Sequence, residues 1–514
     1  MNNCNRKLLT FKETPKIIEN LKKQGEKIVQ CHGTFDLIHP GHLVHFEEAK
    51  ALGDILVVTI TGKSWVNKGP GRPFFNDQMR IKYLTSLEMV DYVVVIPFPA
   101  AIEAIECVKP DVYCKGKEYL NVDNDVTGNI LDDIRAVEGN GGRMAYVGSI
   151  VFSSTKLLNK HFETYSPEAK AYYKYISADY SSEDFKKIVD SFSGLKVLVV
   201  GDIIFDKYTT VNIQGLTSKN RIMSGRFLYE NMQAGGSLAV FRHLAQFTPD
   251  VKILSLVGKE PWVERELAKY LNKNNDLIIR SSKFTTVVKQ RFTEPMQEGK
   301  ELNKLFSVNY IDKEHPDKSI ENRLLKKLKN IIKEFDMVMV MDFGHGIMQE
   351  RMRNCVQEES KFLALNCQTN SNNHGFNIIT RQYSRADSFS LDNMEMTLAC
   401  GKKQFVPVDE LENVRRRFNS KYCWFTRGAI ETIGIKHNAD TSICPPFENE
   451  VIDPIGAGDA FCSLASLAAV KKLPIHLSTF MGQLAGAQAV RIIGNSKSIK
   501  KGDYLKAGVT MLSY

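Results

Sequence analysis

The chain has 514 residues, too many for a single hydrophobic core, so its length predicts two to four domains. Hydrophobic residues make up 43% and charged residues 25%, which is typical of a soluble globular protein and argues against a disordered chain. The 68 basic and 59 acidic residues give a net charge of +9, which fits anionic small substrates; without a basic stripe interleaved with aromatics, we expect no nucleic-acid partner.

We expect a cytoplasmic protein that does not bind membranes. The opening segment MNNCNRKLLTFKETPK has no apolar signal region, and no stretch reaches the roughly 18 apolar residues of a membrane span. The ten cysteines form no C-x-x-C pair, which indicates reduced thiols rather than a disulfide framework.

Between about residues 25 and 150, short β-branched runs alternate with helical patterns. The runs are KIVQC, DILVVTIT, DYVVVIP, DVYCKG and RMAYVG. This alternation predicts an α/β domain with a doubly wound parallel sheet, to which we assign residues 1–165. A tyrosine-rich segment at 166–195 predicts a partly helical connector, and a second α/β pattern, opening with KVLVVGDIIFD, is assigned to 196–514.

The segment CHGTFDLIHPGH places two histidines just beyond the first predicted strand. Gly33 ends that strand, and Pro40 suits the first turn of a helix that contains His42. Unpaired N–H groups at a helix N-terminus can bind an anion. His39 and His42 could donate hydrogen bonds to a phosphoryl group as it becomes five-coordinate, so the pattern predicts transition-state stabilisation.

Two other interpretations of these histidines stay open. His32, His39, His42 and His45 are close enough in sequence for a zinc site, although no carboxylate or thiol stands at ligand spacing. The side chains could also cap or pack, an interpretation that suits His45 best.

The first domain resembles the cytidylyltransferase-like nucleotidyltransferases over about residues 27 to 162. The resemblance is carried by GTFDLIHPGH, NKGPGRPFFNDQMR, VDYVVV, KPDVYCKGKEY and FSST. Members of this family activate glycerol, ethanolamine or heptose phosphates as CDP or ADP derivatives. The similarity implies a Rossmann-like sheet and catalytic roles for His39 and His42 at the α-phosphate. It implies a catalytic role for Lys68 as well, in holding phosphate charge. The nucleotide- and phosphate-binding residues that it implies are Gly33, Thr34, Phe35, Arg80, Ser153, Ser154 and Thr155.

Two alternatives apply to these motifs. Taken alone, the Ser153 to Thr155 turn could be an ordinary helix cap. The H-x-G-H motif also occurs in class I aminoacyl-tRNA synthetases. The second lysine signature of the synthetases is not evident, however, and no all-helical anticodon-binding region follows.

The second domain contains GAGDAFCSLASLAAV, a glycine-rich turn that leads into an apolar and therefore buried helix. Gly456 and Gly458 allow the backbone to approach a phosphate, and Asp459 stands at the helix start. A carboxylate there can take a proton from an attacking hydroxyl while N–H groups stabilise the transferred phosphoryl group. Without its context, the same string could be a turn with a capping aspartate.

Residues 196 to about 495 resemble the ribokinase family of carbohydrate kinases. The motifs are VLVVGDIIFD, QAGGSLAV, TVVKQRF, MDFGHG, WFTRGAIETIGI and DPIGAGDAF, in the family's order. The similarity implies that Asp459 is the catalytic base and that Glu395, with Asp392, orients Mg²⁺ through water. The anion hole would be Gly456, Ala457 and Gly458, the nucleotide contacts Thr426 and Gly428, and the substrate contacts Asp206, Gly235, Gly236, Lys289 and Arg291.

The chain departs from the family pattern at three places. Ala239 stands in place of an asparagine, Asp392 replaces the asparagine of an N-x-x-E motif, and NCQTNSNNHGFN replaces an aspartate-proline-lysine segment. The first and the third weaken the substrate assignment, whereas Asp392, the second, can still serve a hydrated metal. A kinase-like domain that has lost or altered its catalysis therefore stays an alternative.

Together the halves predict an enzyme that phosphorylates a sugar or polyol and then joins the phosphate to a nucleotide. This resembles the bifunctional heptose-phosphate kinase and nucleotidyltransferase of lipopolysaccharide synthesis, with the domain order reversed. The segment VNKGPGRP favours CTP over ATP, and both families imply a homodimer. The alternatives are an active nucleotidyltransferase joined to a ligand-binding or dimerising module, and a non-catalytic sensor.

Overall fold

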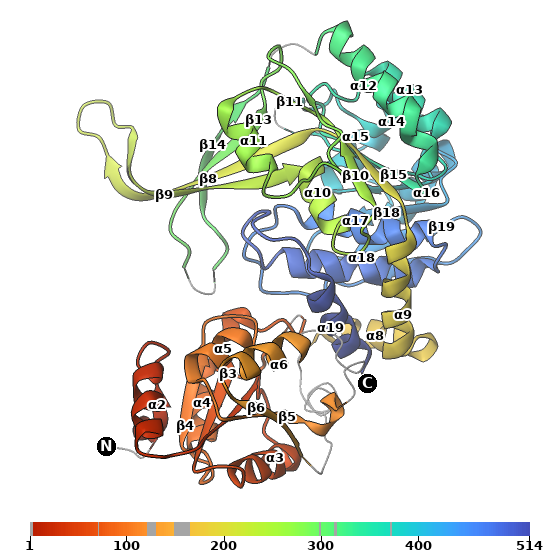
Figure 1. Cartoon of the computed structure of the whole chain (residues 1–514). Helices are drawn as coiled ribbons and strands as arrows, with labels where there is room; N and C mark the ends of the chain where they lie inside the picture. Colours follow the sequence, from red (N-terminus) through yellow and green to blue (C-terminus); the bar gives the residue numbers. More distant parts are fainter. Residues whose placement is uncertain are drawn as a thin grey trace. The chain divides into compact units, whose positions relative to one another are not determined.

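The computed structural model describes residues 4–69, 71–120, 130–148, 165–297, 300–312, 316–370 and 373–513. Contacts between residues divide the chain into two compact units (Figure 1). The first contains Met1–Lys186 and Lys501–Tyr514, and the second contains Lys187–Lys500. None of the helices among the described residues is long and apolar enough to cross a membrane.

The first unit is built on a six-stranded, wholly parallel sheet, which confirms the predicted doubly wound fold. The strand order is β1-β4-β3-β2-β5-β6, so the chain reverses its direction across the sheet between β2 and β5. Crevices at such reversal points are where open parallel sheets bind ligands. The strands are β1 Leu8–Leu9, β2 Ile28–Gly33, β3 Ile55–Thr61, β4 Tyr92–Ile96, β5 Val112–Gly116 and β6 Arg143–Val147.

Helices cover both faces of this sheet, which is why its strands are nearly continuous apolar runs. Phe46 and Leu84 belong to the hydrophobic core on one face, and Ile18 and Val108 belong to the core on the other. The helices are α1 Cys4–Lys7, α2 Thr14–Lys23, α3 Pro40–Lys50, α4 Asp77–Thr85, α5 Ile102–Val108 and α6 Ile130–Gly139, with 3₁₀ turns η1 Lys63–Trp65 and η2 Lys117–Tyr119.

The segment predicted as a connector is helical, with α8 at Pro167–Asp179, α9 at Ser182–Asp190 and the 3₁₀ turn η4 at Ser191–Gly194. It packs against α19, Lys501–Leu512, although the sequence assigns those residues to the second domain. The ring of Tyr504 stacks on Phe185 with centroids 5.9 Å apart. A Cβ atom at Gly508 would lie 2.2 Å from the Phe185 ring, so this close approach requires glycine.

The second unit has a main sheet of eight strands in the order β10-β7-β15-β16-β17-β18-β19-β20. Pairing is parallel from β10 to β18 and antiparallel for the last two strands. The strands are β7 Val197–Gly201, β10 Val251–Leu254, β15 Met337–Asp342, β16 Leu363–Cys367, β17 Ser388–Leu391, β18 Tyr422–Thr426, β19 Thr432–Lys436 and β20 Thr441–Cys444.

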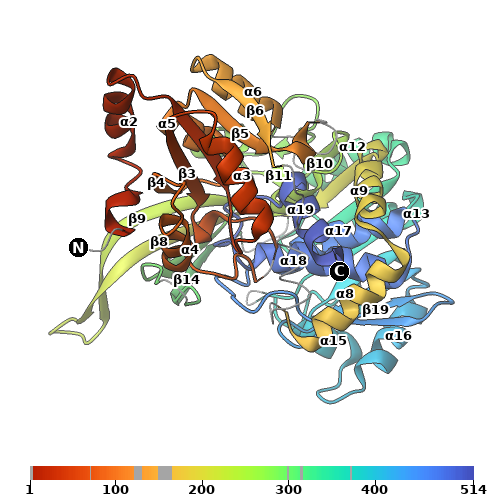
Figure 2. The same cartoon turned by 90° about the horizontal axis from the view of Figure 1, so that it is seen from below.

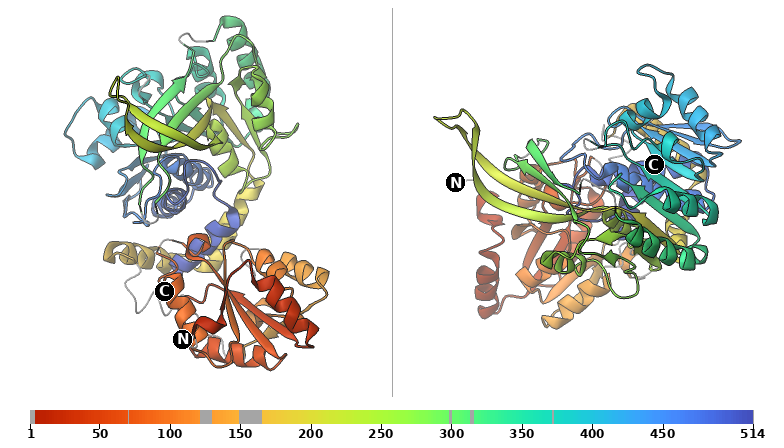
Figure 3. Two further views of the ribbon diagram at one scale, coloured as in Figure 1. Left: turned by 90° about the vertical axis from the view of Figure 1, so that its left-hand side faces the viewer. Right: turned by 90° about the horizontal axis from the view of Figure 1, so that it is seen from above.

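A second, four-stranded sheet, which we call the lid sheet, has the order β14-β13-β8-β9. Its strands are β8 Ile203–Leu216, β9 Met223–Gly236, β13 Val287–Thr293 and β14 Lys304–Tyr310. The long β8 and β9 ribbon extends beyond the rest of the second unit (Figure 3). Because β8 leaves the main sheet directly after β7, the lid sheet begins beside the carboxyl end of that strand.

The helices of the second unit flank the main sheet. Helix α17 is almost wholly buried and packs along α18 (Figure 2), which agrees with its apolar sequence. The helices are α10 Ser237–Leu244, α11 Pro261–Leu267, α12 Lys318–Ile331, α13 Glu350–Glu359, α14 Ile379–Gln382, α15 Asn393–Cys400, α16 Pro407–Arg417, α17 Ala457–Val470 and α18 Ile475–Ala489, with the 3₁₀ turn η5 at Ile332–Glu334.

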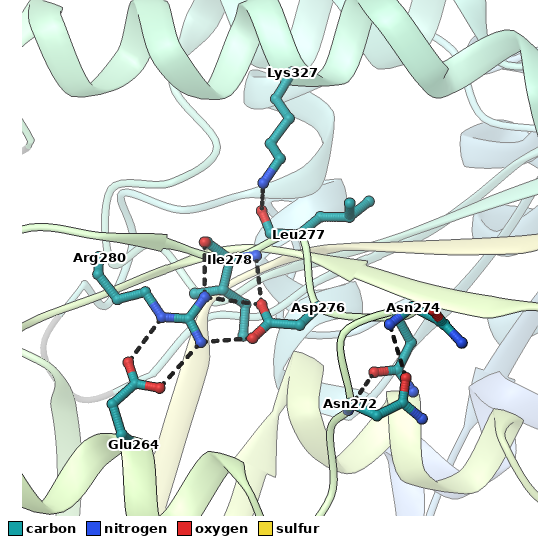
Figure 4. A network of polar contacts seen from close by, with 9 residues as sticks. Glu264, Asn272, Asn274, Asp276, Leu277, Ile278, Arg280 and Lys327 are labelled. Atoms are coloured by element: carbon teal, nitrogen blue, oxygen red, sulfur yellow. Dashed lines mark hydrogen bonds and ion pairs between the residues drawn. The ribbon is translucent and has the colours of Figure 1, made fainter.

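A polar network fixes the short strand pair β11 (Leu256–Val257) and β12 (Ile279–Arg280) between two helices (Figure 4). Arg280 forms ion pairs with Asp276, at 2.6 Å, and with Glu264 of α11, at 2.8 Å. Lys327 of α12 donates a hydrogen bond of 3.0 Å to the Leu277 carbonyl. The Arg280 guanidinium therefore has a structural role, because these interactions hold it within the protein.

Candidate active sites

The first candidate site lies where β2 ends and α3 begins. Phe35 has a left-handed φ of 44° and turns its ring back toward Gly33, where a Cβ would be 3.1 Å from that ring. The same ring meets His42 edge-on with centroids 5.4 Å apart. The turn is therefore compact, and it places His39 as the N-cap residue of α3.

The rings of His39 and His42 are stacked, with centroids 3.9 Å apart and planes 19° from parallel. Burial lowers the pKa of His39, and burial together with the charges of neighbouring groups lowers the pKa of His42 to about 3. Both imidazoles are therefore neutral at pH 7, and each has one N–H to donate. Two close donors suit oxygens on which charge develops during reaction.

Lys68 lies in the loop between η1 and α4. Burial, followed by the charges of Lys506 in α19 and of Arg72, lowers the pKa of Lys68 to about 7, while Asp36 opposes the shift. Arg72 and Asp36 form a buried ion pair at 3.5 Å. An anion beside Lys68 would restore its ordinary charge, so the site favours phosphate.

Arg80 is fully buried, and its interactions are to the protein. It donates to the carbonyls of Thr34 at 2.7 Å and Thr61 at 2.8 Å and pairs with Asp77 at 2.5 Å. It therefore ties together the ends of β2 and β3. A direct contact of Arg80 with nucleotide stays a prediction, and the geometry supports a positioning role.

Some of the residues predicted for this site cannot be placed. Ser153, Ser154 and Thr155 lie outside the described residues. Across the described ranges, no group of three or more histidine, cysteine, aspartate or glutamate side chains could hold a metal ion. The four histidines proposed above as a zinc site, His32, His39, His42 and His45, are among the described residues and form no such group.

The second candidate site forms at the start of α17. Gly456 has φ of +86°, and a Cβ there would lie 2.3 Å from Oδ1 of Asn495. The N–H group of Ala457 donates to the Pro454 carbonyl at 3.3 Å, and that of Gly458 follows in the first helical turn, where backbone donors lack partners within the helix. An anion hole formed by Gly456, Ala457 and Gly458 stays a prediction.

Asp459 is 7% exposed, and Gln368 donates a hydrogen bond of 2.9 Å to its Oδ1. Burial, assisted by Asp206, raises the pKa of Asp459 to about 7, while the Gln368 bond and Lys289 oppose the rise. A carboxylate that exchanges its proton near neutral pH is suited to act as a general base.

The lid sheet presents polar side chains to the same region. Lys289 pairs in register with Asp206, and Arg291 pairs with Tyr208, so all four side chains lie on one face. Arg291 forms a short ion pair with Asp206, and Asn495 donates to the other oxygen of Asp206 at 3.4 Å. Asn495 therefore links the lid sheet to the turn at Gly456.

The two glycines at the end of β9 permit close packing. A Cβ at Gly235 would lie 2.2 Å from the Asp206 carboxylate. Gly236 has φ of +58°, and a Cβ there would lie 2.4 Å from the Asp202 carbonyl. Gly235 therefore lets the β9 backbone lie directly against the Asp206 carboxylate, and Gly236 lets it lie against the Asp202 carbonyl.

Asp392 and Glu395 form a capping box at the start of α15, with N–H to carboxylate distances of 2.7 and 2.9 Å. Burial and the charge of Asp392 raise the pKa of Glu395 well above its usual range. The capping bonds use one oxygen of each carboxylate, and Glu395 also accepts a hydrogen bond from the Thr369 backbone, so a contact of this pair with a hydrated Mg²⁺ stays a prediction. Thr426 donates to the Leu391 carbonyl at 3.3 Å, and Gly428 has φ of +56°.

Sequence reasoning missed three residues of these sites. Gln368 belongs to the segment interpreted as a loss, yet it follows β16 directly and reaches Asp459. Asn495 and Lys506 lie in stretches without a recognised motif. For Gln368, its place directly after a buried strand was the available signal.

Both sites contain side chains of the kinds that nucleotide-dependent transferases use. Comparison with known proteins points to the same class of enzyme. Residues 196–501, more than half of the chain, match the pfkB family carbohydrate kinase model, and residues 30–187 match the cytidylyltransferase-like model. The chain therefore belongs to the pfkB family of carbohydrate kinases and has an additional cytidylyltransferase-like domain before the kinase domain. The predicted pair of domains and their order are confirmed.

Curated relatives are similar to this chain in sequence over part of its length. It is 39% identical over 139 residues to the "Bifunctional protein HldE" of Aliarcobacter butzleri, covering 26% of this chain and 29% of that protein. It is 36% identical over 155 residues to the protein of the same name from Desulfatibacillum aliphaticivorans, covering 30% of each. The chain thus spans less than a third of the length of these relatives.

Solved structures also resemble the chain. Phosphofructokinase-2 from Escherichia coli, in complex with substrates and products, is 11% identical with a TM-score of 0.49, over 61% of this chain and 98% of that one. A carbohydrate kinase from Agrobacterium tumefaciens is 18% identical with a TM-score of 0.44, over 61% and 97%.

The pKa of Asp459 leads to a first prediction. If Asp459 must be ionised to act as a base, kinase kcat/KM falls as the pH drops below about 7. Gln368→Leu removes a hydrogen bond that lowers this pKa, so the acidic limb moves to higher pH by about one unit. A pH profile of ADP formation tests this, with exposed Gln246→Leu as control. An unmoved limb in Gln368→Leu contradicts the role given to Gln368.

The turn at Gly456 leads to a second prediction. Gly456→Ala places a methyl group against Asn495 in a left-handed conformation, so the anion hole is displaced and kinase kcat falls roughly 100-fold. Gly401→Ala has similar backbone strain, with φ of +69°, but no atom within 4 Å, and it retains kinase activity. Equal losses in both variants would mean that strain, rather than the displaced turn, explains the effect.

Proposed function

We propose that the chain synthesises a nucleotide-activated sugar or polyol in two steps. The kinase unit transfers a phosphoryl group from ATP to a sugar hydroxyl, and the other unit joins a sugar phosphate to a nucleotide with release of pyrophosphate. The observation that carries the proposal is the presence in one chain of the stacked His39 and His42 pair and of a buried Asp459 beside Gly456.

In the nucleotidyl transfer, an oxygen of the sugar phosphate attacks the α-phosphorus and the bond to the β-phosphate breaks. Neutral His39 and His42 donate N–H hydrogen bonds to the α-phosphoryl oxygens as negative charge collects there. Lys68, surrounded by other cations, balances phosphate charge. We propose CTP as the donor to test first, because VNKGPGRP is similar to cytidylyl members, and ATP as the second.

In the kinase reaction, Asp459 accepts the proton of a sugar hydroxyl as its oxygen attacks the γ-phosphorus, and ADP leaves. N–H groups of residues 456–458 stabilise the transferred group. Asp206, Lys289 and Arg291 bind the substrate from the lid sheet, beside Gly235 and Gly236. Mg²⁺ bound with the triphosphate would neutralise phosphate charge and be oriented through water by Glu395 and Asp392.

The biological setting follows from the same resemblance. We propose that the product enters lipopolysaccharide or other surface polysaccharide synthesis, and that the protein works in the cytoplasm, where nucleotides and sugar phosphates are available. The second candidate function is nucleotidyl transfer alone, with the kinase-like unit as a binding module. It is favoured by Ala239 and by the ion pair that already engages Asp206.

Paired variants test both steps. The purified chain is supplied with Mg²⁺, ATP, CTP and a panel of sugars and sugar phosphates, and pyrophosphate and ADP are measured. We expect Asp459→Asn to abolish product from free sugar and keep product from sugar phosphate, because only the kinase base is lost. His42→Ala should lower pyrophosphate release at least 100-fold and leave ADP formation intact.

Each outcome separates the candidates. Undiminished pyrophosphate release by His42→Ala would sink the nucleotidyltransferase assignment. ADP formation that does not respond to Asp459→Asn contradicts the role of Asp459 as the base, whereas absence of ADP formation by the unmodified protein favours nucleotidyl transfer alone.

We also propose a homodimer that forms through the outer face of the lid sheet. Phe306, Val308 and Tyr310 alternate along β14 and are 55%, 39% and 50% exposed. The register places them on the face opposite Lys289 and Arg291. An exposed apolar row of this kind is typical of an interaction surface.

The dimer is tested by sedimentation. Phe306→Asp should convert the dimer to a monomer, because burying the new charge would be costly, whereas Val406→Asp, at another exposed apolar position, should leave the dimer intact. A monomeric unmodified protein contradicts the proposal.

A further inference from the structure

Helix α19 belongs to the first unit even though it follows the entire kinase unit in sequence. Apart from Lys501, it lies beyond the residues that match either family model. Buried Tyr504 and Gly508 fix one side of the helix against Phe185. These contacts set the rotation of α19 about its axis, and with it the direction of the remaining side chains.

A second contact joins α19 to the loop of the nucleotidyltransferase site. Gly69 has φ of +91°, and a Cβ there would lie 3.3 Å from Cβ and 3.4 Å from Cα of Ala507. The loop backbone therefore packs directly on the helix. Lys68 directly precedes Gly69 in the sequence, and Lys506 directly precedes Ala507.

The charge of Lys506 acts on two groups of this site. After burial, it is the largest influence that lowers the pKa of Lys68 to about 7, and with burial and Lys115 it lowers the pKa of His32 to about 3. Lys115 has an ion pair of 2.9 Å with Asp133. The charge of Lys506 thus acts on the end of β2 as well as on the Lys68 loop.

The acidic group beside Lys68 is already engaged. Asp36 accepts hydrogen bonds from the N–H groups of Phe74 at 2.8 Å and Phe75 at 2.9 Å, and it pairs with Arg72. The positive charges of Lys68 and Lys506 repel one another, which is how Lys506 lowers the pKa of Lys68. A polyphosphate, with several negative oxygens in a row, would neutralise both ammonium groups at once.

We propose that Lys506 is a further substrate-binding residue of the nucleotidyltransferase site and that it binds, together with Lys68, the phosphate chain of the nucleoside triphosphate and of the leaving pyrophosphate. This inference rests on the proposed nucleotidyl transfer. It would make the site composite, because α19 would add a side chain to the site that begins at the end of β2.

The kinetic test compares three variants. Lys506→Gln should raise the KM for the nucleotide in pyrophosphate release roughly tenfold or more, because one phosphate contact is lost. Lys506→Arg keeps the charge and should restore KM to within about threefold. Lys500→Gln removes a charge from an exposed position just before α19 and should change nothing. ADP formation and the melting temperature serve as controls that the chain is intact.

The pH profile gives a readout that a purely structural role would not move. Loss of the Lys506 charge raises the pKa of Lys68, since a repulsive neighbour is removed, while Arg72, Arg80 and Asp36 stay in place. The basic limb of pyrophosphate release should shift to higher pH in Lys506→Gln and return in Lys506→Arg. An unchanged KM and an unmoved limb in Lys506→Gln overturn the inference.

Lysine acylation separates this inference from the proposed function. CTP, ATP and inorganic tripolyphosphate are tested for protection of individual lysines, which are identified by mass spectrometry of peptides, without any need for turnover. Protection of Lys68 and Lys506 but not Lys500 supports the inference even if no sugar phosphate yields pyrophosphate. Lack of protection of Lys506 by every triphosphate overturns it, whatever happens at Lys68.

Discussion

Both candidate sites depend on a helix that begins without a side-chain cap. In α3 and in α17, the N-cap residues His39 and Gly456 make no side-chain hydrogen bond to the first turn. Unpaired N–H groups in a first turn and the helix dipole favour an anion. In α3, Pro40 has no N–H and the N–H of His42 donates to the His39 carbonyl at 2.8 Å, so the dipole and the side chains contribute more there. The rest of each site is arranged around this feature. Phe35 and Arg80 support the turn before α3, and Asn495 restricts the turn before α17.

Burial has opposite effects on the acids and bases of the two sites, and both effects serve phosphate chemistry. It lowers the pKa of His42 to about 3 and of Lys68 to about 7, and it raises the pKa of Asp459 to about 7. In each case burial disfavours the charged form of the side chain until a bound ligand provides an opposite charge or hydrogen bonds. Neutral imidazoles donate hydrogen bonds without carrying charge, and a carboxyl group near its titration point accepts a proton readily.

The sequence predicted the parts of this architecture that arise from local patterns. Alternation of β-branched runs and helices predicted the doubly wound sheet, and the turns at His39 and Gly456 were found because short motifs determine local backbone shape. Features that depend on packing between distant segments were not predictable. The inward direction of Arg80 depends on carbonyls of two strands, and the bond from Gln368 to Asp459 crosses the unit. Pattern analysis assigned 501–514 to the kinase because no motif in α19 marks its partner, Phe185.

The chain order of the first unit has a consequence for biosynthesis. A ribosome makes α19 only after all residues of the second unit, so the nascent first unit exists for a time with Phe185 and the Gly69 loop uncovered. The kinase unit can fold during this interval, since domains fold as they emerge. The nucleotidyltransferase domain, although it is made first, then acquires its last helix after its neighbour. Expression of residues 1–186 alone would therefore give a domain with an exposed apolar seam.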